Sequence, residues 1–284
     1  MGGDTEATYI VTGANTGIGK ATAAGLARRG ARVMMVSRDP AKGEAAKADL
    51  LASQPGARLE VVQGDLGSLA TTRALAEALL GRCPRIDALV NNAGVWMTER
   101  EETPDGFEKT FGVNHLAPFL LTHLLRDRLA ETGGARIVNL SSALYVRGRL
   151  DFDDLQSERG KFSGTRAYST SKLANLYFTQ ELARRLEGSG VTTYAVHPGV
   201  VRTELPRRMN GVMRAGFKVI SLFLKSPAQG AATSLHCATA PGIEAQSGRY
   251  FAGSRPRAVR GPGKDVAAAR RLWEVSERLV GLAR

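Results

Sequence analysis

The chain has 284 residues, of which 43% are hydrophobic and 23% are charged. This composition is ordinary for a globular protein and excludes a disordered, collagen-like or disulfide-scaffold chain. No run approaches the roughly 18 apolar residues that cross a bilayer, and no basic-then-apolar leader opens the sequence, so we expect a cytoplasmic location. The two cysteines, Cys83 and Cys237, and the four histidines lack the spacing of metal ligands, so no metal site is expected.

The net charge of +12 is unevenly distributed along the chain. Residues 1–201 carry 24 basic and 22 acidic side chains, whereas residues 202–284 carry 15 basic and 5 acidic ones. A basic surplus is typical of proteins that bind nucleic acids or anionic membranes. Because the sequence has no basic helix with base-reading geometry and no aromatic stacking platform, we expect no nucleic-acid partner.

Short apolar runs rich in β-forming residues alternate with helical patterns along the chain. In chain order these runs are Tyr9–Val11, Arg32–Val36, Leu59–Gln63, Asp87–Asn91, Arg136–Leu140 and Val191–Val196. Each is separated from the next by a segment long enough for a helix, which is the pattern of parallel βαβ units. Helices are expected to begin at Pro40 and Pro227, because Asp39 and Ser226 each place a capping side chain before a proline at the first helical position.

This alternation predicts an α/β fold: a doubly wound, Rossmann-type parallel sheet of about seven strands with helices on both faces. No repeat or low-complexity linker interrupts it, so residues 1–284 are expected to form a single domain. Within this domain we expect a flexible N-terminus at residues 1–8. Residues 205–284 are expected to form a substrate lid and a C-terminal extension.

The first strand is followed by the glycine-rich segment Thr12–Gly19, and a helical pattern begins at about Gly17. Glycines permit a tight turn and let a pyrophosphate approach the backbone at the helix N-terminus. The segment therefore indicates a dinucleotide site, although a plain strand-to-helix turn stays open as the alternative.

The second strand ends at Ser37-Arg38, and Lys42 lies one helical turn further on. An acidic residue at this position accepts a hydrogen bond from the ribose of NAD, whereas an arginine accommodates the 2′-phosphate of NADP. Arg38 thus favours NADP(H) over NAD(H), with a plain surface charge as the alternative.

Tyr168 and Lys172 are spaced to share one face of a helix. A free tyrosine has a pKa near 10, and a neighbouring ammonium favours the phenolate, so Lys172 is expected to lower the pKa of Tyr168. A tyrosine with a pKa closer to neutral can act as a general acid or base. This spacing also occurs by chance in many helices, so further matches are needed.

Three such matches are Asn91–Gly94 (NNAG), Asn114 and Ser141-Ser142. With them the chain resembles a short-chain dehydrogenase/reductase. The resemblance implies the catalytic residues Asn114, Ser142, Tyr168 and Lys172. It also implies cofactor contacts, which are Gly13, Asn15, Thr16, Gly17, Ile18, Gly19, Arg38, Asp65, Leu66, Asn92, Ala93, Gly94, Tyr168, Lys172, Pro198, Gly199, Val201 and Thr203.

Longer segments, among them GVNHLAPFLLTHLL and SKLANLYFTQELARRL, resemble the retinol dehydrogenase branch of that family. The branch reduces retinal and other apolar carbonyls with NADPH, so the resemblance implies a small apolar carbonyl or alcohol substrate. The insertion Leu144–Arg166 is a mark of the same branch. Trp96-Met97 departs from it, because smaller or sulfur-containing residues are usual there. His115, beside Asn114, is expected to be a packed histidine.

The substrate side is expected to come from Leu144–Arg166 and from residues 205–225. In the latter segment Met213, Phe217, Ile220 and Leu224 follow helical spacing, which indicates an apolar stripe. A lid over the substrate and a helix packed on the core are both consistent with it. Because basic residues repeat beside the stripe, peripheral contact with an anionic membrane surface also stays open.

Other functions remain as alternatives at this stage. A soluble reductase of polyketide, steroid or xenobiotic carbonyls differs little from a retinal reductase in its expected sequence. A carrier-bound acyl reductase would use the basic surface, and a non-catalytic cofactor-sensing protein belongs to a different class. The complete set of four catalytic residues argues against the sensor. A homodimer also stays open.

Overall fold

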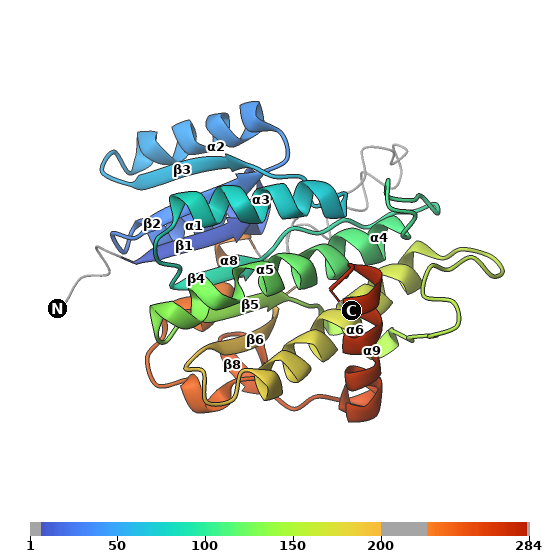
Figure 1. Ribbon diagram of the computed structural model, residues 1–284. Helices are drawn as coiled ribbons and strands as arrows, with labels where there is room; N and C mark the ends of the chain where they lie inside the picture. The colour runs from blue at the N-terminus through green and yellow to red at the C-terminus, as the bar shows by residue number, and fades with distance from the viewer. Residues whose placement is uncertain (1–6, 200–225, 283–284) are drawn as a thin grey trace.

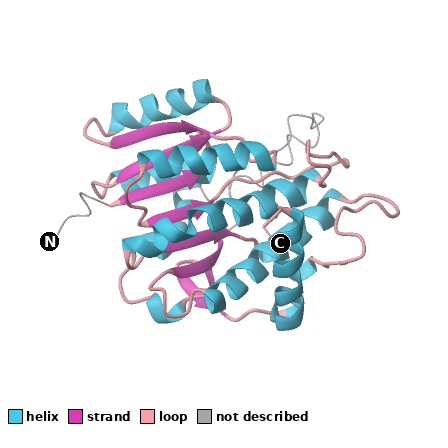
Figure 2. Cartoon of the chain, viewed as in Figure 1, coloured by secondary structure: helices cyan, strands magenta, loops and turns pink. Residues whose placement is uncertain are grey.

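The computed structural model describes residues 7–199 and 226–282, and its centre is one eight-stranded sheet in the order β3-β2-β1-β4-β5-β6-β7-β8 (Figures 1 and 2). The strands are β1 (Thr8–Thr12), β2 (Arg32–Ser37), β3 (Arg58–Gln63), β4 (Ala88–Asn91), β5 (Arg136–Leu140), β6 (Thr192–His197), β7 (Tyr250–Ala252) and β8 (Arg255–Arg257). The first seven run parallel, and β8 pairs antiparallel with β7 at the edge. The expected doubly wound α/β fold is confirmed, with β8 as a strand beyond the expected seven.

Helices cover both faces of the sheet. They are α1 (Gly17–Ala27), α2 (Pro40–Ser53), α3 (Leu69–Arg82), α4 (Lys109–Phe111), α5 (Ala117–Thr132), α6 (Gly164–Arg185), α8 (Pro227–Thr239) and α9 (Val266–Leu279). Helices α3, α5 and α6 lie on the face toward the viewer in Figure 1, α1 and α8 pack together on the other face, and α9 packs on the outside of α6. No helix in the described ranges is long and apolar enough to cross a membrane.

Local sequence explains where these elements form. All residues of β1 and β4 are buried, as expected for strands covered on both faces. The predicted caps are confirmed: Asp39 accepts a hydrogen bond from the backbone N–H of Lys42, and Ser226 forms a capping box with Gln229. Because parallel strands end at the same edge of a sheet, the loops after β1, β2, β3, β4 and β5 all meet there.

One boundary that we predicted from the sequence needs correction, and the predicted C-terminal extension can be described from residue 226 onward. Thr8 belongs to β1 and donates its N–H to Asp87, and Ala7 before it is also buried, so the predicted flexible segment 1–8 is wrong at these two residues. Residues 226–282 are a structural part of the domain: they supply α8, β7, β8 and α9, which complete the sheet and both helical layers. The predicted lid, residues 205–225, lies outside the described residues.

The C-terminal helix α9 is anchored to a short π-helical segment, residues 112–116, by one buried polar contact. His115 Nε2 lies 2.9 Å from Ser276 Oγ of α9, and both residues are buried. Burial lowers the pKa of His115 to about 3, so the ring is neutral at physiological pH, and the expected packed histidine is confirmed. The rings of Phe119 and Trp273 pack beside this contact with centroids 4.9 Å apart.

We predict that Ser276→Ala lowers the free energy of unfolding by about 1–3 kcal/mol, because it leaves a buried ring nitrogen of His115 without a partner. Urea unfolding followed by circular dichroism measures this change. Ser53→Ala, at an exposed position on α2, is the matched control and should change stability little. Equal stabilities of the two variants would contradict the anchoring role of Ser276.

Candidate active site

A cavity of about 930 Å³ lies at the carboxyl edge of the sheet. Many of its lining residues are those predicted to bind a cofactor: Gly13, Asn15, Thr16, Gly17, Ile18, Gly19, Arg38, Asp65, Leu66, Asn92, Ala93, Gly94, Tyr168, Lys172 and Pro198. Gly199 is described but does not line the cavity, and Val201 and Thr203 lie outside the described residues. The structure thus brings most of the predicted residues to one place.

The glycine-rich segment forms one end of this cavity. Gly13 has a φ of 65°, which an L side chain rarely adopts, and a Cβ atom on Gly19 would overlap the carbonyl oxygen of Gly13. The N-cap of α1, Thr16, makes no side-chain hydrogen bond to the helix, unlike the caps of α2, α3, α6, α8 and α9. A helix N-terminus without a side-chain cap, behind a glycine-rich turn, fits a pyrophosphate group.

The turn is tied to the end of the neighbouring strand β4. Asn92 donates through its side-chain amide to the carbonyl of Thr12 at 2.7 Å, and the Thr12 hydroxyl accepts from the backbone N–H groups of Asn92 and Ala93 at 3.0 Å each. These bonds fix the ends of β1 and β4 against each other. They explain why the NNAG segment lies beside the glycine-rich turn, where the chain order of the strands reverses.

Basic groups lie where β2 ends. Arg38 is exposed on the cavity wall and forms no ion pair with any described residue. Lys42 lies 3.5 Å from Asp39 and also lines the cavity. In the loop after the neighbouring strand β3, Asp65 accepts from the backbone N–H of Gly67 at 2.9 Å, which holds this loop in place. Arg38 and Lys42 are therefore the basic side chains that line the cavity at the end of β2.

Tyr168 and Lys172 lie on α6 as the spacing predicts, with Lys172 Nζ 5.4 Å from the centre of the Tyr168 ring. Lys172 is buried and donates to the carbonyl of Leu140 at 3.1 Å, and burial lowers the pKa of its ammonium to about 8. The expected lowering of the pKa of Tyr168 is wrong for this structure: burial raises the pKa of the phenol.

Asn114 connects three segments next to this pair. Its Oδ1 accepts from the N–H of Val95 at 2.7 Å, and its Nδ2 donates to the carbonyl of Val95 at 2.9 Å and to the hydroxyl of Ser171 at 3.0 Å. Gly94 lies directly above, since a Cβ there would be 3.2 Å from Asn114 Oδ1 and 3.6 Å from Lys172 Nζ. Asn114 and Lys172 thus form the buried floor under Tyr168.

Ser142 follows β5 at the same edge of the sheet. Its hydroxyl accepts from the N–H of Leu144 at 3.2 Å and caps the short 3₁₀ helix Ala143–Arg147. The preceding residue, Ser141, lines the cavity, whereas Ser142 does not. The insertion predicted on the substrate side contributes Ser163, Gly164 and Thr165 to the lining.

Sequence reasoning missed several residues that line the cavity, and one of them stacks directly on Tyr168. The indole of Trp96 stacks on the Tyr168 ring with centroids 4.5 Å apart and an interplanar angle of 9°. Trp96 was noted only as a departure from the retinol dehydrogenase pattern. An aromatic residue two positions after NNAG was the signal that could have placed it in the site.

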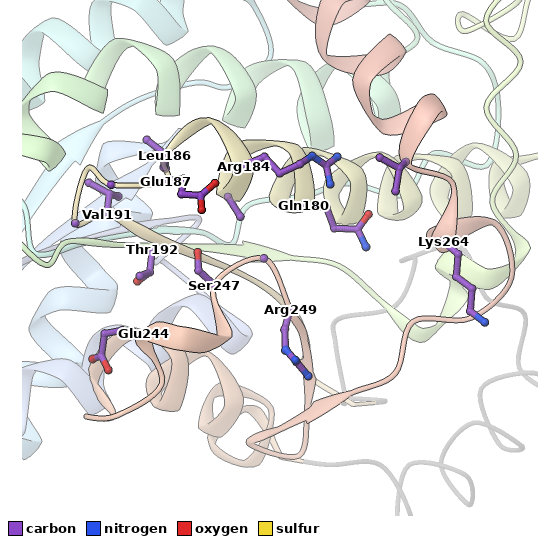
Figure 3. Close-up of a pocket in the computed structure, with 15 residues that line it drawn as sticks. Gln180, Arg184, Leu186, Glu187, Val191, Thr192, Glu244, Ser247, Arg249 and Lys264 are labelled. Carbon is purple, nitrogen blue, oxygen red and sulfur yellow. The ribbon is translucent and has the colours of Figure 1, made fainter.

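A second groove, of about 800 Å³, lies between the C-terminal half of α6 and the segment around β7 (Figure 3). Arg184 and Glu187 line one side and Glu244 and Arg249 the other. In the described part of the chain, no residue predicted to be catalytic or to bind a cofactor lines this groove. The candidate active site is therefore the cavity at the carboxyl edge of the sheet.

Comparison with known proteins shows the family to which the chain belongs. A sequence profile described as short chain dehydrogenase matches residues 7–212. Retinol dehydrogenase 12 of Mus musculus is 48% identical over 96% of this chain and 86% of its own length, and retinol dehydrogenase 11 of Homo sapiens is 48% identical over 96% and 85%.

Solved structures agree with the sequence relatives. An uncharacterised protein from Mycobacterium Paratuberculosis is 35% identical, with a TM-score of 0.80 over 98% of this chain and 95% of its own. RhlG of Pseudomonas aeruginosa, solved as an active-site complex with NADP, is 26% identical, with a TM-score of 0.67 over 86% of this chain and 93% of its own. The chain belongs to the short-chain dehydrogenase family of oxidoreductases and is retinol dehydrogenase-like.

Proposed function

We propose that the protein is an NADP(H)-dependent oxidoreductase that interconverts an apolar aldehyde or ketone, such as retinal, and its alcohol. The observation that carries this proposal is one cavity with two ends. At one end lie the glycine-rich turn and Arg38, and at the other lies Tyr168 above the buried Lys172 and Asn114. The names of the retinol dehydrogenase relatives support an apolar substrate.

The residues of the first end fit a dinucleotide. The pyrophosphate would be held by the backbone between Gly13 and Gly19 and by the uncapped N-terminus of α1. Arg38 and Lys42 would hold a 2′-phosphate, and Asp65 the adenine side. When bound, the reduced cofactor supplies the hydride for the carbonyl carbon.

The residues of the second end would handle the proton. Tyr168 would donate its hydroxyl proton to the carbonyl oxygen, and Ser142 would donate a hydrogen bond to the same oxygen as its negative charge develops. Lys172 would hold its ammonium under the phenol and return a proton to it. Asn114, fixed by its three hydrogen bonds, would hold a water that supplies that proton.

The location and assembly proposed from the sequence depend on parts not described. Peripheral membrane contact was assigned to residues 205–225, which lie outside the described residues, as does the predicted lid. The proposal includes a cytoplasmic location with peripheral contact to a membrane surface. A homodimer stays open.

The proposed function is tested by NADPH oxidation with a set of carbonyl compounds: all-trans-retinal, linear aldehydes and a steroid ketone. Reduction of the aldehydes with a preference for NADPH is the expected result. A preference for the steroid ketone would instead favour a soluble reductase of other carbonyls. No turnover with any compound, together with tight cofactor binding, would contradict an enzyme and favour a cofactor sensor.

We predict that Tyr168→Phe lowers kcat at least about 100-fold, because positioned acid catalysis contributes about 10²–10⁴-fold. Cofactor binding, measured by the change in NADPH fluorescence, should persist in this variant. Tyr250→Phe, which removes a buried phenol outside the cavity, is the matched control and should keep its turnover. Normal turnover of Tyr168→Phe would exclude Tyr168 as the acid.

We predict that Arg38→Asp lowers the preference for NADPH over NADH by about 10- to 100-fold. The change removes a charged hydrogen-bond donor to the 2′-phosphate and places a carboxylate where it can accept from a ribose hydroxyl. The ratio of kcat/KM for the two cofactors measures it. Arg29→Asp, at an exposed position outside the cavity, is the control, and equal ratios in both variants would contradict the role of Arg38.

A further inference from the structure

Trp96 is a large apolar side chain that the proposed mechanism does not use. It is 48% exposed, whereas most large apolar side chains in the described ranges are buried. One face of its indole lies on the Tyr168 ring, and the exposed remainder forms part of the cavity wall. An exposed tryptophan beside the reacting hydroxyl can contact whatever binds there.

The backbone on both sides of Trp96 is held in place. On one side, Val95 forms hydrogen bonds through both its N–H and its carbonyl to the side chain of Asn114. On the other side, the carbonyl of Met97 lies so close to Gly164 that a Cβ there would overlap it. Gly164 is the first residue of α6, so the Trp96 backbone is held close to the helix that carries Tyr168.

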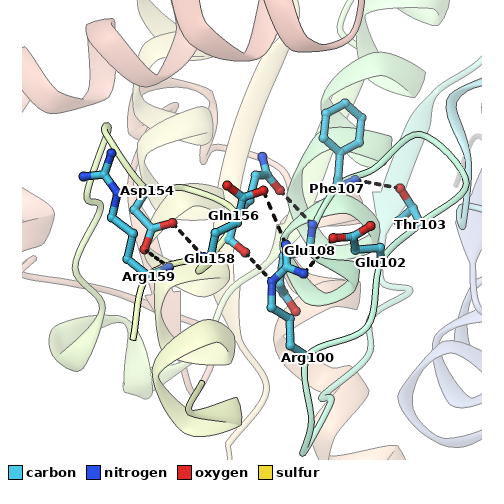
Figure 4. A network of polar contacts seen from close by, with 9 residues as sticks. All are labelled: Arg100, Glu102, Thr103, Phe107, Glu108, Asp154, Gln156, Glu158 and Arg159. Atoms are coloured by element: carbon cyan, nitrogen blue, oxygen red, sulfur yellow. Dashed lines mark hydrogen bonds and ion pairs between the residues drawn. The ribbon is translucent and has the colours of Figure 1, made fainter. Parts of the chain in front are cut away.

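A third connection joins the loop that carries Trp96 to the insertion Leu144–Arg166 (Figure 4). It is made by Arg100, four residues after Trp96. Arg100 donates through Nε to the carbonyl of Gln156 at 3.0 Å and through Nη1 to Glu102 at 2.6 Å. The side-chain oxygen of Gln156 in turn accepts from the N–H of Glu108 at 2.7 Å. The position of Trp96 is therefore set by contacts before it, after it and beneath it.

A fixed aromatic wall discriminates between ligands by their shape. A flat, conjugated group can lie on an indole face with all its atoms in contact at once, as stacked aromatic rings do. A saturated chain makes fewer such contacts and loses rotational freedom when it is ordered. Trp96 is thus suited to a substrate with a planar segment next to its carbonyl group.

We propose that Trp96 is a specificity-determining residue, whose exposed surface packs against a planar conjugated segment adjoining the reacting carbonyl. The inference rests on the proposed carbonyl reduction and adds the residue that selects among substrates. In this proposal Trp96 affects the binding of the substrate, and Tyr168 transfers the proton.

The test compares trans,trans-2,4-decadienal with decanal, which have the same number of carbons and differ in conjugation. The ratio of kcat/KM for the two aldehydes, with NADPH, is measured for the unchanged protein, Trp96→Ala, Trp96→Phe and Val266→Ala. Differences in intrinsic reactivity cancel when these ratios are compared between variants. Val266 is the matched control, since it is an apolar side chain with the same exposed fraction, 48%, outside the cavity.

We expect Trp96→Ala to lower the ratio about 3- to 10-fold, and Trp96→Phe and Val266→Ala to keep it within about twofold. An unchanged ratio in Trp96→Ala, with both aldehydes still reduced, would overturn the role of Trp96 and leave the proposed function intact. If the unchanged protein reduces neither aldehyde nor retinal, the proposed function itself fails. Thermal unfolding of each variant checks that the fold is kept.

Discussion

The buried ammonium of Lys172 is the constraint on which the active-site structure depends. A buried cation costs several kcal/mol unless its hydrogen bonds are satisfied, and no described carboxylate forms an ion pair with this one. Its hydrogen-bond acceptor is the carbonyl of Leu140, at the end of β5, with the Tyr168 ring on the other side. Since burial lowers its pKa to about 8, the ammonium stays mostly protonated at neutral pH but holds its proton less tightly than an exposed lysine does, which is the kind of perturbation found at functional sites.

Asn114 links the surroundings of Lys172 to other segments of the chain through hydrogen bonds. Its single amide joins the Val95 backbone, the π-helical segment that carries it and Ser171 on α6. The next residue, His115, joins the same segment to α9 through Ser276. The loop that carries the cavity's exposed tryptophan and the C-terminal helix are therefore attached to opposite sides of one segment, so the far end of the chain helps to set the floor of the site.

The sequence was informative wherever a signal is local. Buried apolar runs located β1 to β6, capping residues located the starts of α2 and α8, and the glycine spacing located the turn after β1. It was uninformative where contacts are made between distant segments. The short strands β7 and β8 have no periodicity of their own, and the stacking of Trp96 on Tyr168 depends on the approach of Met97 to Gly164. The direction of the Tyr168 pKa shift also depends on burial, which spacing along a helix does not contain.

The basic residues that line the cavity and those that give the chain its net positive charge lie in different parts of the sequence. The basic groups of the cavity, Arg38, Lys42 and Lys172, all come from the nearly neutral first part of the chain, and no residue of 226–282 lines the cavity. In that later range β8 is fully exposed, and Arg271 reaches Asp153 at only 4.0 Å. Such solvated charges are screened beyond about 10 Å at 0.1 M salt, so they act weakly on a dinucleotide held at the glycine-rich turn. The basic side chains of residues 226–282 therefore lie on the outer surface, while the groups of the cavity suited to an anion are a few local side chains and one helix N-terminus.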